Sequence, residues 1–160
     1  MDITEMVERR VAENDDVIEM QSGSMREGFR LESSDLDFMN WLNDHRVIWD
    51  MCQSEYYYTE NKTLILWDSS ESQPGFTLLE LLTPTINREV QSACVPMNDR
   101  LYISSSLYRQ QTLSHRYPGS REHGPCESGV VLGRLEYDIA QCLACNFWPP
   151  SAPSYTNTCP

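Results

Sequence analysis

Short runs of apolar and β-branched residues recur along this chain between polar segments, and the pattern predicts a series of strands. Residues 69–75, rich in Ser, Pro and Gly, form one turn-forming break between two such runs. Residues 115–129 are rich in Gly, Pro and Ser, so we expect an irregular loop there. The runs predict strands near residues 17–21, 35–42, 46–52, 63–68, 76–82 and 101–103, with another within 130–140.

Two segments have the spacing of helices instead. Apolar residues recur every three or four positions near the N-terminus, and Asp2 and Glu5 are placed to form a capping box. We therefore expect a helix over residues 2–13 and a second one over residues 104–112.

Length and composition indicate one domain. The chain has 160 residues, of which 40% are apolar, and this is enough for a single globular core. We assign the domain to residues 1–148. Residues 149–160 open with three prolines in five positions and continue with polar residues, so we expect a disordered tail.

The ends and the charge of the chain restrict its location and partners. No apolar run is long enough to span a membrane, and residues 1–5 lack the features of a signal peptide, so we expect a cytoplasmic or nuclear protein. The net charge of −12 argues against broad binding to nucleic acid, which needs a basic surface. A local basic patch remains open, built from Arg9, Arg10, Arg26 and Arg30.

Candidate chemistry begins with a pair of carboxylates in the run at 35–42. On a strand, Asp35 and Asp37 project to the same side, roughly 6.6 Å apart along the strand. Two neighbouring carboxylates repel one another, and a hard dication such as Mg²⁺ removes the conflict. The alternative is an exposed strand edge with two solvated acids, which is common in an acidic chain.

A Gly-Ser turn precedes this pair. Gly23 permits a positive φ and a close approach of a ligand to the backbone, and the Ser24 hydroxyl is a suitable phosphate donor. Taken alone, Gly23-Ser24 is an ordinary turn. Followed at this spacing by Asp-x-Asp, it resembles the signature of the polymerase-β-like nucleotidyltransferase superfamily. The resemblance is most specific to cyclic GMP–AMP synthase-like receptors and male-abnormal-21-like proteins, and it rests on Gly23, Ser24, Glu27, Gly28, Ser34, Asp35 and Asp37.

The resemblance implies a third acid on a later, neighbouring strand. Asp138 is the best candidate, because an apolar run and Trp148-Pro149 follow it as in the family. Glu136 is a competing choice, because it lies on the same side of a regular strand. The alternative for Asp138 is a single charge on an amphipathic helix without a role in a site. The implied fold is an α+β polymerase-β-like lobe, a mixed twisted sheet flanked by helices, with the second helical lobe missing.

The implied function is metal-dependent nucleotidyl transfer. Asp35, Asp37 and Asp138 would hold Mg²⁺ or Mn²⁺, and Gly23 and Ser24 would bind the triphosphate. The substrates would be ATP and GTP, and the product a cyclic or linear dinucleotide in innate immune signalling. Nucleic acid or another ligand would be the activator, although the acidic charge does not support nucleic acid. Without its second lobe the chain could be inactive, and the alternative is a non-catalytic ligand-binding or scaffolding protein.

The cysteines offer a different metal. Cys142 and Cys145 have the spacing of zinc ligands, and His123 and Cys126 could complete a site. A second Cys-x-x-Cys is absent, and Cys142 and Cys145 lie in an apolar run where free thiols are ordinary. We therefore expect thiols, with a zinc-stabilised binding module as a third possibility.

Overall fold

The computed structural model describes residues 10–11, 17–28, 35–57, 62–113, 119–131 and 133–147. The chain divides into two compact units, and each consists of two segments. The first unit comprises Met1–Asn43 and Ser105–Leu143, and the second comprises Asp44–Ser104 and Ala144–Pro160. The predicted tail at 149–160 lies outside the described residues.

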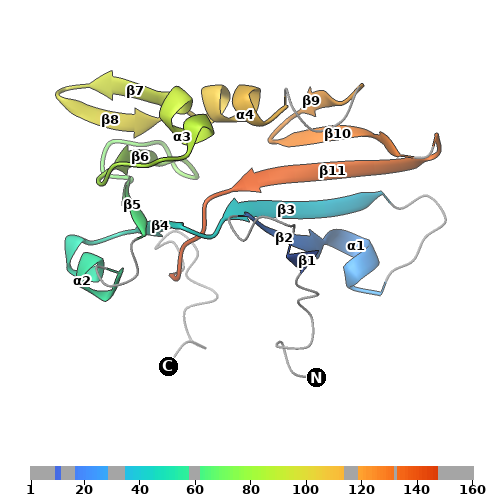
Figure 1. The fold of residues 1–160 in the computed structure, drawn as a ribbon, viewed down its shortest axis with the longest axis horizontal. Helices are drawn as coiled ribbons and strands as arrows, with labels where there is room; N and C mark the ends of the chain where they lie inside the picture. The colour runs from blue at the N-terminus through green and yellow to red at the C-terminus, as the bar shows by residue number, and fades with distance from the viewer. Residues whose placement is uncertain are drawn as a thin grey trace. The chain divides into compact units, whose positions relative to one another are not determined.

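The first unit is built on a six-stranded sheet of order β1-β2-β3-β11-β10-β9, shown in Figure 1. Neighbouring strands are antiparallel except β3 and β11, which are parallel. Its helices are α1 (Gly23–Arg26) and α4 (Ser105–Leu113). Its strands are β1 (Arg10–Val11), β2 (Val17–Ser22), β3 (Leu36–Leu42), β9 (Arg121–His123), β10 (Cys126–Val131) and β11 (Leu135–Cys142).

The two faces of this sheet differ in burial. Alternate residues of a strand point to opposite faces, and directly paired residues share a face. The core face carries the buried side chains Asn40, Leu42, Tyr137, Ile139 and Glu127. The opposite face, which we call the acidic face, carries Asp37 and Asp138, and its other members are mostly half-buried. They include Met39, Trp41, Ala140, Cys142, Cys126 and Ser128.

The second unit has a five-stranded sheet of order β4-β5-β6-β8-β7, in which only β4 and β5 are parallel. Its core includes Ile48 and Ile65, and the rings of Trp49 and Trp67 both stack on Phe147. The elements are β4 (His45–Ile48), η2 (Met51–Gln53), α2 (Ser54–Tyr57), β5 (Thr63–Asp68), β6 (Leu78–Leu81), α3 (Arg88–Ala93), β7 (Cys94–Met97) and β8 (Arg100–Ile103).

The predicted fold class, an α+β lobe whose mixed twisted sheet is flanked by helices, is wrong. Within the described residues, strands dominate, and the four α-helices have four, four, six and nine residues. One physical reason is the shortness of some connections. Only Asn43 and Asp44 separate β3 from β4, and the Gly23–Arg26 segment completes a single turn. Such connections are too short to supply the apolar stripe with which a helix covers a sheet.

Several local predictions are confirmed. The strands expected at 17–21, 35–42, 63–68, 76–82 and 101–103 and the helix at 104–112 all form, with small shifts of their ends. The segment expected as a strand at 46–52 leaves the sheet after Ile48 and turns into η2. The predicted helix at 2–13 lies mostly outside the described residues, and its Arg10 and Val11 pair with β2 instead.

The expected irregular loop at 115–129 is also wrong over its described part. Residues 121–123 and 126–131 form the antiparallel pair β9 and β10. Gly124 and Pro125 make the two-residue turn between them, with Gly124 at φ 59°. Glycine at the first central position is typical of a type II′ hairpin turn. Gly124 and Pro125, which had suggested an irregular loop, therefore form the turn of a β-hairpin. No helix in the described ranges is long and apolar enough to cross a membrane.

Candidate metal centre

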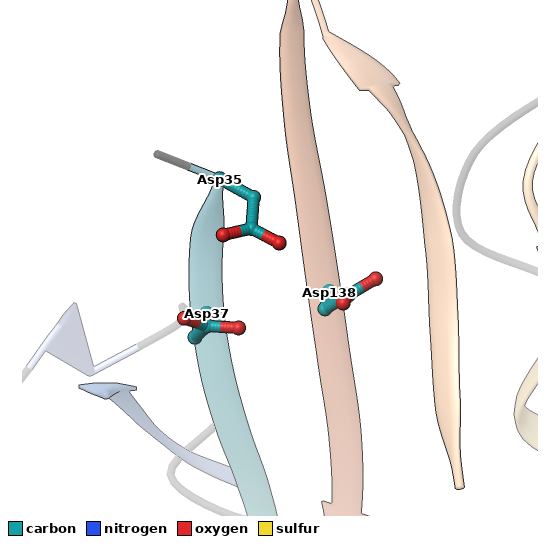
Figure 2. A group of neighbouring side chains, drawn as sticks. All are labelled: Asp35, Asp37 and Asp138. Carbon is teal, nitrogen blue, oxygen red and sulfur yellow. The ribbon is translucent and has the colours of Figure 1, made fainter. Parts of the chain in front are cut away.

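The structure brings Asp35, Asp37 and Asp138 together on the acidic face. Each offers one carboxylate oxygen, and these oxygens all lie within 4.8 Å of one another. Figure 2 shows Asp35 just before β3, Asp37 near the start of that strand and Asp138 on the neighbouring β11, with Asp35 directed toward the other two. All three side chains are half-buried, so the group is open to solvent and to a ligand.

The parallel pairing of β3 and β11 brings the Asp37 and Asp138 carboxylates close together. Asp138 is the direct partner of Asp37 in the register, which runs from Leu36 opposite Tyr137 to Trp41 opposite Cys142. The core face fixes the register, because a slip of one residue would move the buried Tyr137 and Ile139 to the acidic face. The competing acid, Glu136, is exposed, pairs with Val130 and is not part of the group.

Gly23 forms the wall beside Asp37. Ser22 is the partner of Asp37 on β2, and Gly23 follows it with φ 73°, a conformation that favours glycine. A Cβ at position 23 would overlap the Asp37 carboxylate, including its Oδ2 atom. The missing side chain therefore lets the carboxylate lie directly on the backbone of the turn. The hydroxyl of Ser24, which is half-buried, makes no hydrogen bond within the described part of the chain.

The electrostatics of the group are unbalanced. Loss of hydration raises the pKa of Asp37, and the charges of Asp35 and Asp138 raise it further. No Arg, Lys or His among the described residues forms an ion pair with any of the three carboxylates. A bound cation would offset this concentration of negative charge.

A fourth side chain restrains Asp138. The hydroxyl of Ser128, on β10, donates a hydrogen bond to Asp138 Oδ1. Ser128 and Asp138 are direct partners in the β10–β11 pairing. The row continues to β9, where Arg121 is the partner of Ser128, so Asp37, Asp138, Ser128 and Arg121 follow one another across the sheet.

These residues fit Mg²⁺ or Mn²⁺. The donors are three carboxylates, the hard oxygen ligands that both cations prefer. The open face leaves room for the water and phosphate ligands with which Mg²⁺ usually completes its shell. The space that the missing Cβ of Gly23 leaves beside Asp37 brings one ligand close to the turn that is expected to bind phosphate.

The zinc alternative has less support. The three aspartates are the only group of three or more potential metal ligands in the described ranges. Burial raises the pKa of Cys142 and of Cys126, and the charges of Asp138 and Asp37 raise that of Cys126 further. Raised values favour the neutral thiol over the thiolate that zinc needs.

The sequence did not single out Ser128 or Arg121, because both lie in or beside the segment expected to be a loop. If Gly124-Pro125 had been recognised as a hairpin turn, Ser128 and Arg121 would have been predicted as paired residues on neighbouring strands, since the turn fixes the pairing of β9 with β10. The basic patch expected from arginines has only Arg26 as a described side chain, and its Nη1 donates to the carbonyl of Gln21.

Comparison with known proteins yields no relative. No family model, no curated protein and no solved structure matches this chain. The resemblance to cyclic GMP–AMP synthase-like receptors therefore remains a prediction from the sequence.

Proposed function

We propose that this protein is a nucleotidyltransferase that depends on Mg²⁺ or Mn²⁺. The observation that carries the proposal is the cluster of three carboxylates, drawn from two strands far apart in the sequence, beside a turn whose glycine makes room for one of them. Hard oxygen ligands adjacent to potential phosphate donors are what metal-assisted phosphoryl chemistry requires.

Each residue has a role in this proposal. Asp35, Asp37 and Asp138 would hold the cation. When bound, the cation would supply positive charge at the phosphates and lower the pKa of the attacking hydroxyl. The Ser24 hydroxyl would donate to a phosphate oxygen, and the backbone at Gly23 would allow the phosphate to approach closely.

The resemblance to cyclic GMP–AMP synthase-like receptors suggests ATP and GTP as substrates and a cyclic or linear dinucleotide as product, in innate immune signalling. The edge of the acidic face supports a phosphate-bearing substrate. Strand β9 alternates so that Arg121 and His123 share the face of the carboxylates, whereas Glu122 points to the core face. Two strand spacings, about 10 Å, separate the backbones at Arg121 and Asp138. A long arginine side chain can reach over much of that distance.

The first test is metal binding by the full chain. We expect saturable Mn²⁺ binding, measured from the loss of the free-ion signal in electron paramagnetic resonance, and loss of this binding in Asp37→Asn. The matched control is Asp99→Asn, which changes an exposed acid in the positive-φ turn of the second unit to a residue that tolerates this conformation. Absence of Mn²⁺ binding by the unaltered protein would overturn the proposal.

The second test is turnover. The chain is incubated with labelled ATP and GTP and with Mg²⁺ or Mn²⁺, and the products are separated by chromatography. Formation of a dinucleotide that Asp37→Asn abolishes supports the enzyme. Metal-dependent nucleotide binding without any product would favour the non-catalytic ligand-binding or scaffolding alternative.

A further inference from the structure

Asp138 is the one carboxylate of the group that a neighbouring side chain holds by a described hydrogen bond. Asp37 lies against the Gly23 backbone, whereas Asp138 accepts at Oδ1 from the Ser128 hydroxyl. A carboxylate that is hydrogen-bonded through one oxygen has a restricted rotation about its last bond. Its other oxygen then remains available to a ligand.

The core face fixes the position of Ser128. Gly129, the next residue, is the partner of Tyr137, and a Cβ at position 129 would overlap the Tyr137 ring and hydroxyl. Tyr137 is buried, so its ring lies against the backbone of β10 and leaves room only for glycine there. A slip of β10 by one residue would bring a side chain into that space and turn Ser128 to the core face. Packing on one face therefore holds the hydroxyl on the other.

We propose that Ser128 is a positioning residue that orients Asp138 for the cation. The inference rests on the proposed metal-dependent function, and it adds a residue that the family resemblance does not supply. Groups that hydrogen-bond to metal ligands fix the orientation of those ligands, and their loss typically weakens metal binding about 10- to 100-fold. Ser128 has this relation to Asp138, and in the proposal it acts through Asp138 without contacting the cation.

The test compares Ser128→Thr with Ser128→Val in the full chain. The two side chains have nearly the same shape, both are β-branched and suit a strand, and only threonine has a hydroxyl. We expect Ser128→Thr to bind Mn²⁺ within about threefold of the unaltered protein, and Ser128→Val to bind about 10- to 100-fold more weakly. Ser106→Ala, an exposed hydroxyl change on α4 in the same unit, is the control and should bind normally.

Circular dichroism and melting without metal accompany each variant, so that a loss of fold is separated from a loss of affinity. Equal Mn²⁺ affinity in the Thr and Val variants would overturn the role of Ser128 and leave the proposed function intact. Absence of Mn²⁺ binding by the unaltered protein would instead reject the proposed function itself. If Ser128→Val is unfolded, Ser128→Ala replaces it, and normal binding by Ser128→Ala would also overturn the role.

Discussion

The two faces of the sheet in the first unit differ in the environment of their carboxylates. On the core face, Glu127 is 3% exposed, and neither of its carboxylate oxygens has a hydrogen-bond partner in the described part of the chain. On the acidic face, three half-buried carboxylates lie together. A single buried carboxylate without a partner costs stability and can bind little, whereas a cluster at the surface creates a place for a cation.

The two arrangements lie on neighbouring strands of one sheet, with Glu127 on β10 and Asp138 on β11. Residues 127 and 128 are neighbours on β10, yet they point to opposite faces. Glu127 lies among buried side chains, and Ser128 restrains Asp138. Burial alone therefore does not identify the carboxylates of this sheet that we propose to hold a cation. What distinguishes these carboxylates is that they lie together in a cluster of three.

The largest expected effect separates the two faces by metal binding. Loss of a group that hydrogen-bonds to a metal ligand typically weakens metal binding roughly 10- to 100-fold. Asp138→Asn removes a proposed ligand itself, so it should weaken Mn²⁺ binding by more than this. Glu127→Gln, the same change of charge on the core face, should leave Mn²⁺ affinity unchanged. Titration of both variants by calorimetry checks the pair. Equal losses would erase the distinction between the faces.

The next effect concerns stability. Glu127→Met removes a buried carboxylate without partners and keeps a similar volume, so it should raise the free energy of unfolding by about 1–3 kcal/mol. For a chain of this size, each kcal/mol corresponds to a rise in Tm of about 2–4 °C. Glu136→Met, an exposed acid on β11, is the control and should change Tm very little. A lower Tm for Glu127→Met would show that Glu127 has a stabilising partner.

The turn beside Asp37 gives a third comparison. Gly23 and Gly28 both have positive φ, but only a Cβ at position 23 would overlap other atoms. Both alanine variants should lose about 1–2 kcal/mol to backbone strain. Only Gly23→Ala should also lose Mn²⁺ affinity, because it displaces the Asp37 carboxylate. Melting curves and Mn²⁺ titrations of the two variants measure the difference, and normal binding by Gly23→Ala would refute the role of this glycine.

The raised pKa of Asp37 predicts a smaller effect, seen without metal. A raised pKa means that ionised Asp37 is less favourable in the folded protein, so its contribution to stability is present below about pH 3.8 and is lost as pH rises through the raised value. Asp37→Asn should therefore gain stability over the unaltered protein between about pH 4 and pH 7. Because the side chain is half-exposed and screened, the gain should stay below about 1 kcal/mol. Denaturant curves at pH 4 and pH 7 measure it, and a gain restricted to acid pH would contradict the assignment.

The smallest expected effect tests the edge of the acidic face. Arg121→Gln should weaken binding of inorganic tripolyphosphate, measured with Mn²⁺ present, by about two- to fivefold, as expected for one solvated charge pair. Arg134→Gln removes an equal charge from the exposed turn before β11 and is the control. Equal affinity in these two variants would remove Arg121 from the site.

Parts of this picture follow from local sequence, and others do not. The strand at 35–42 was predictable because its apolar residues and its two acids alternate in a short run, and alternation is a local property. The partnership of Asp138 with Asp37 was suggested by resemblance alone, since no local pattern encodes which strands pair in parallel. The hairpin at 121–131 was missed because Gly and Pro mark loops and tight turns equally.

The overall architecture was harder to predict than the candidate site. A Gly-Ser turn and three acids specify a local constellation, and that constellation can occur on more than one fold. The expectation that helices flank the sheet came from the resemblance, whereas the spacing of the residues predicted only two helices, at 2–13 and 104–112. The connections at 23–35, 49–62 and 104–120 have room for longer helices, but the described α-helices within them have only four, four and nine residues, and the lengths of the connections did not indicate this.

The parallel pairing of β3 with β11 also determines when the site can exist. Asp37 and Asp138 are separated by 101 positions (138 − 37), and most of the second unit lies between them in the chain. Contacts between residues so distant in sequence form late, because a long loop must close before they gain anything. During synthesis on the ribosome, the carboxylate pair cannot assemble until β11 has emerged. A cation that binds the group would therefore recognise only chains whose first unit has completed its fold.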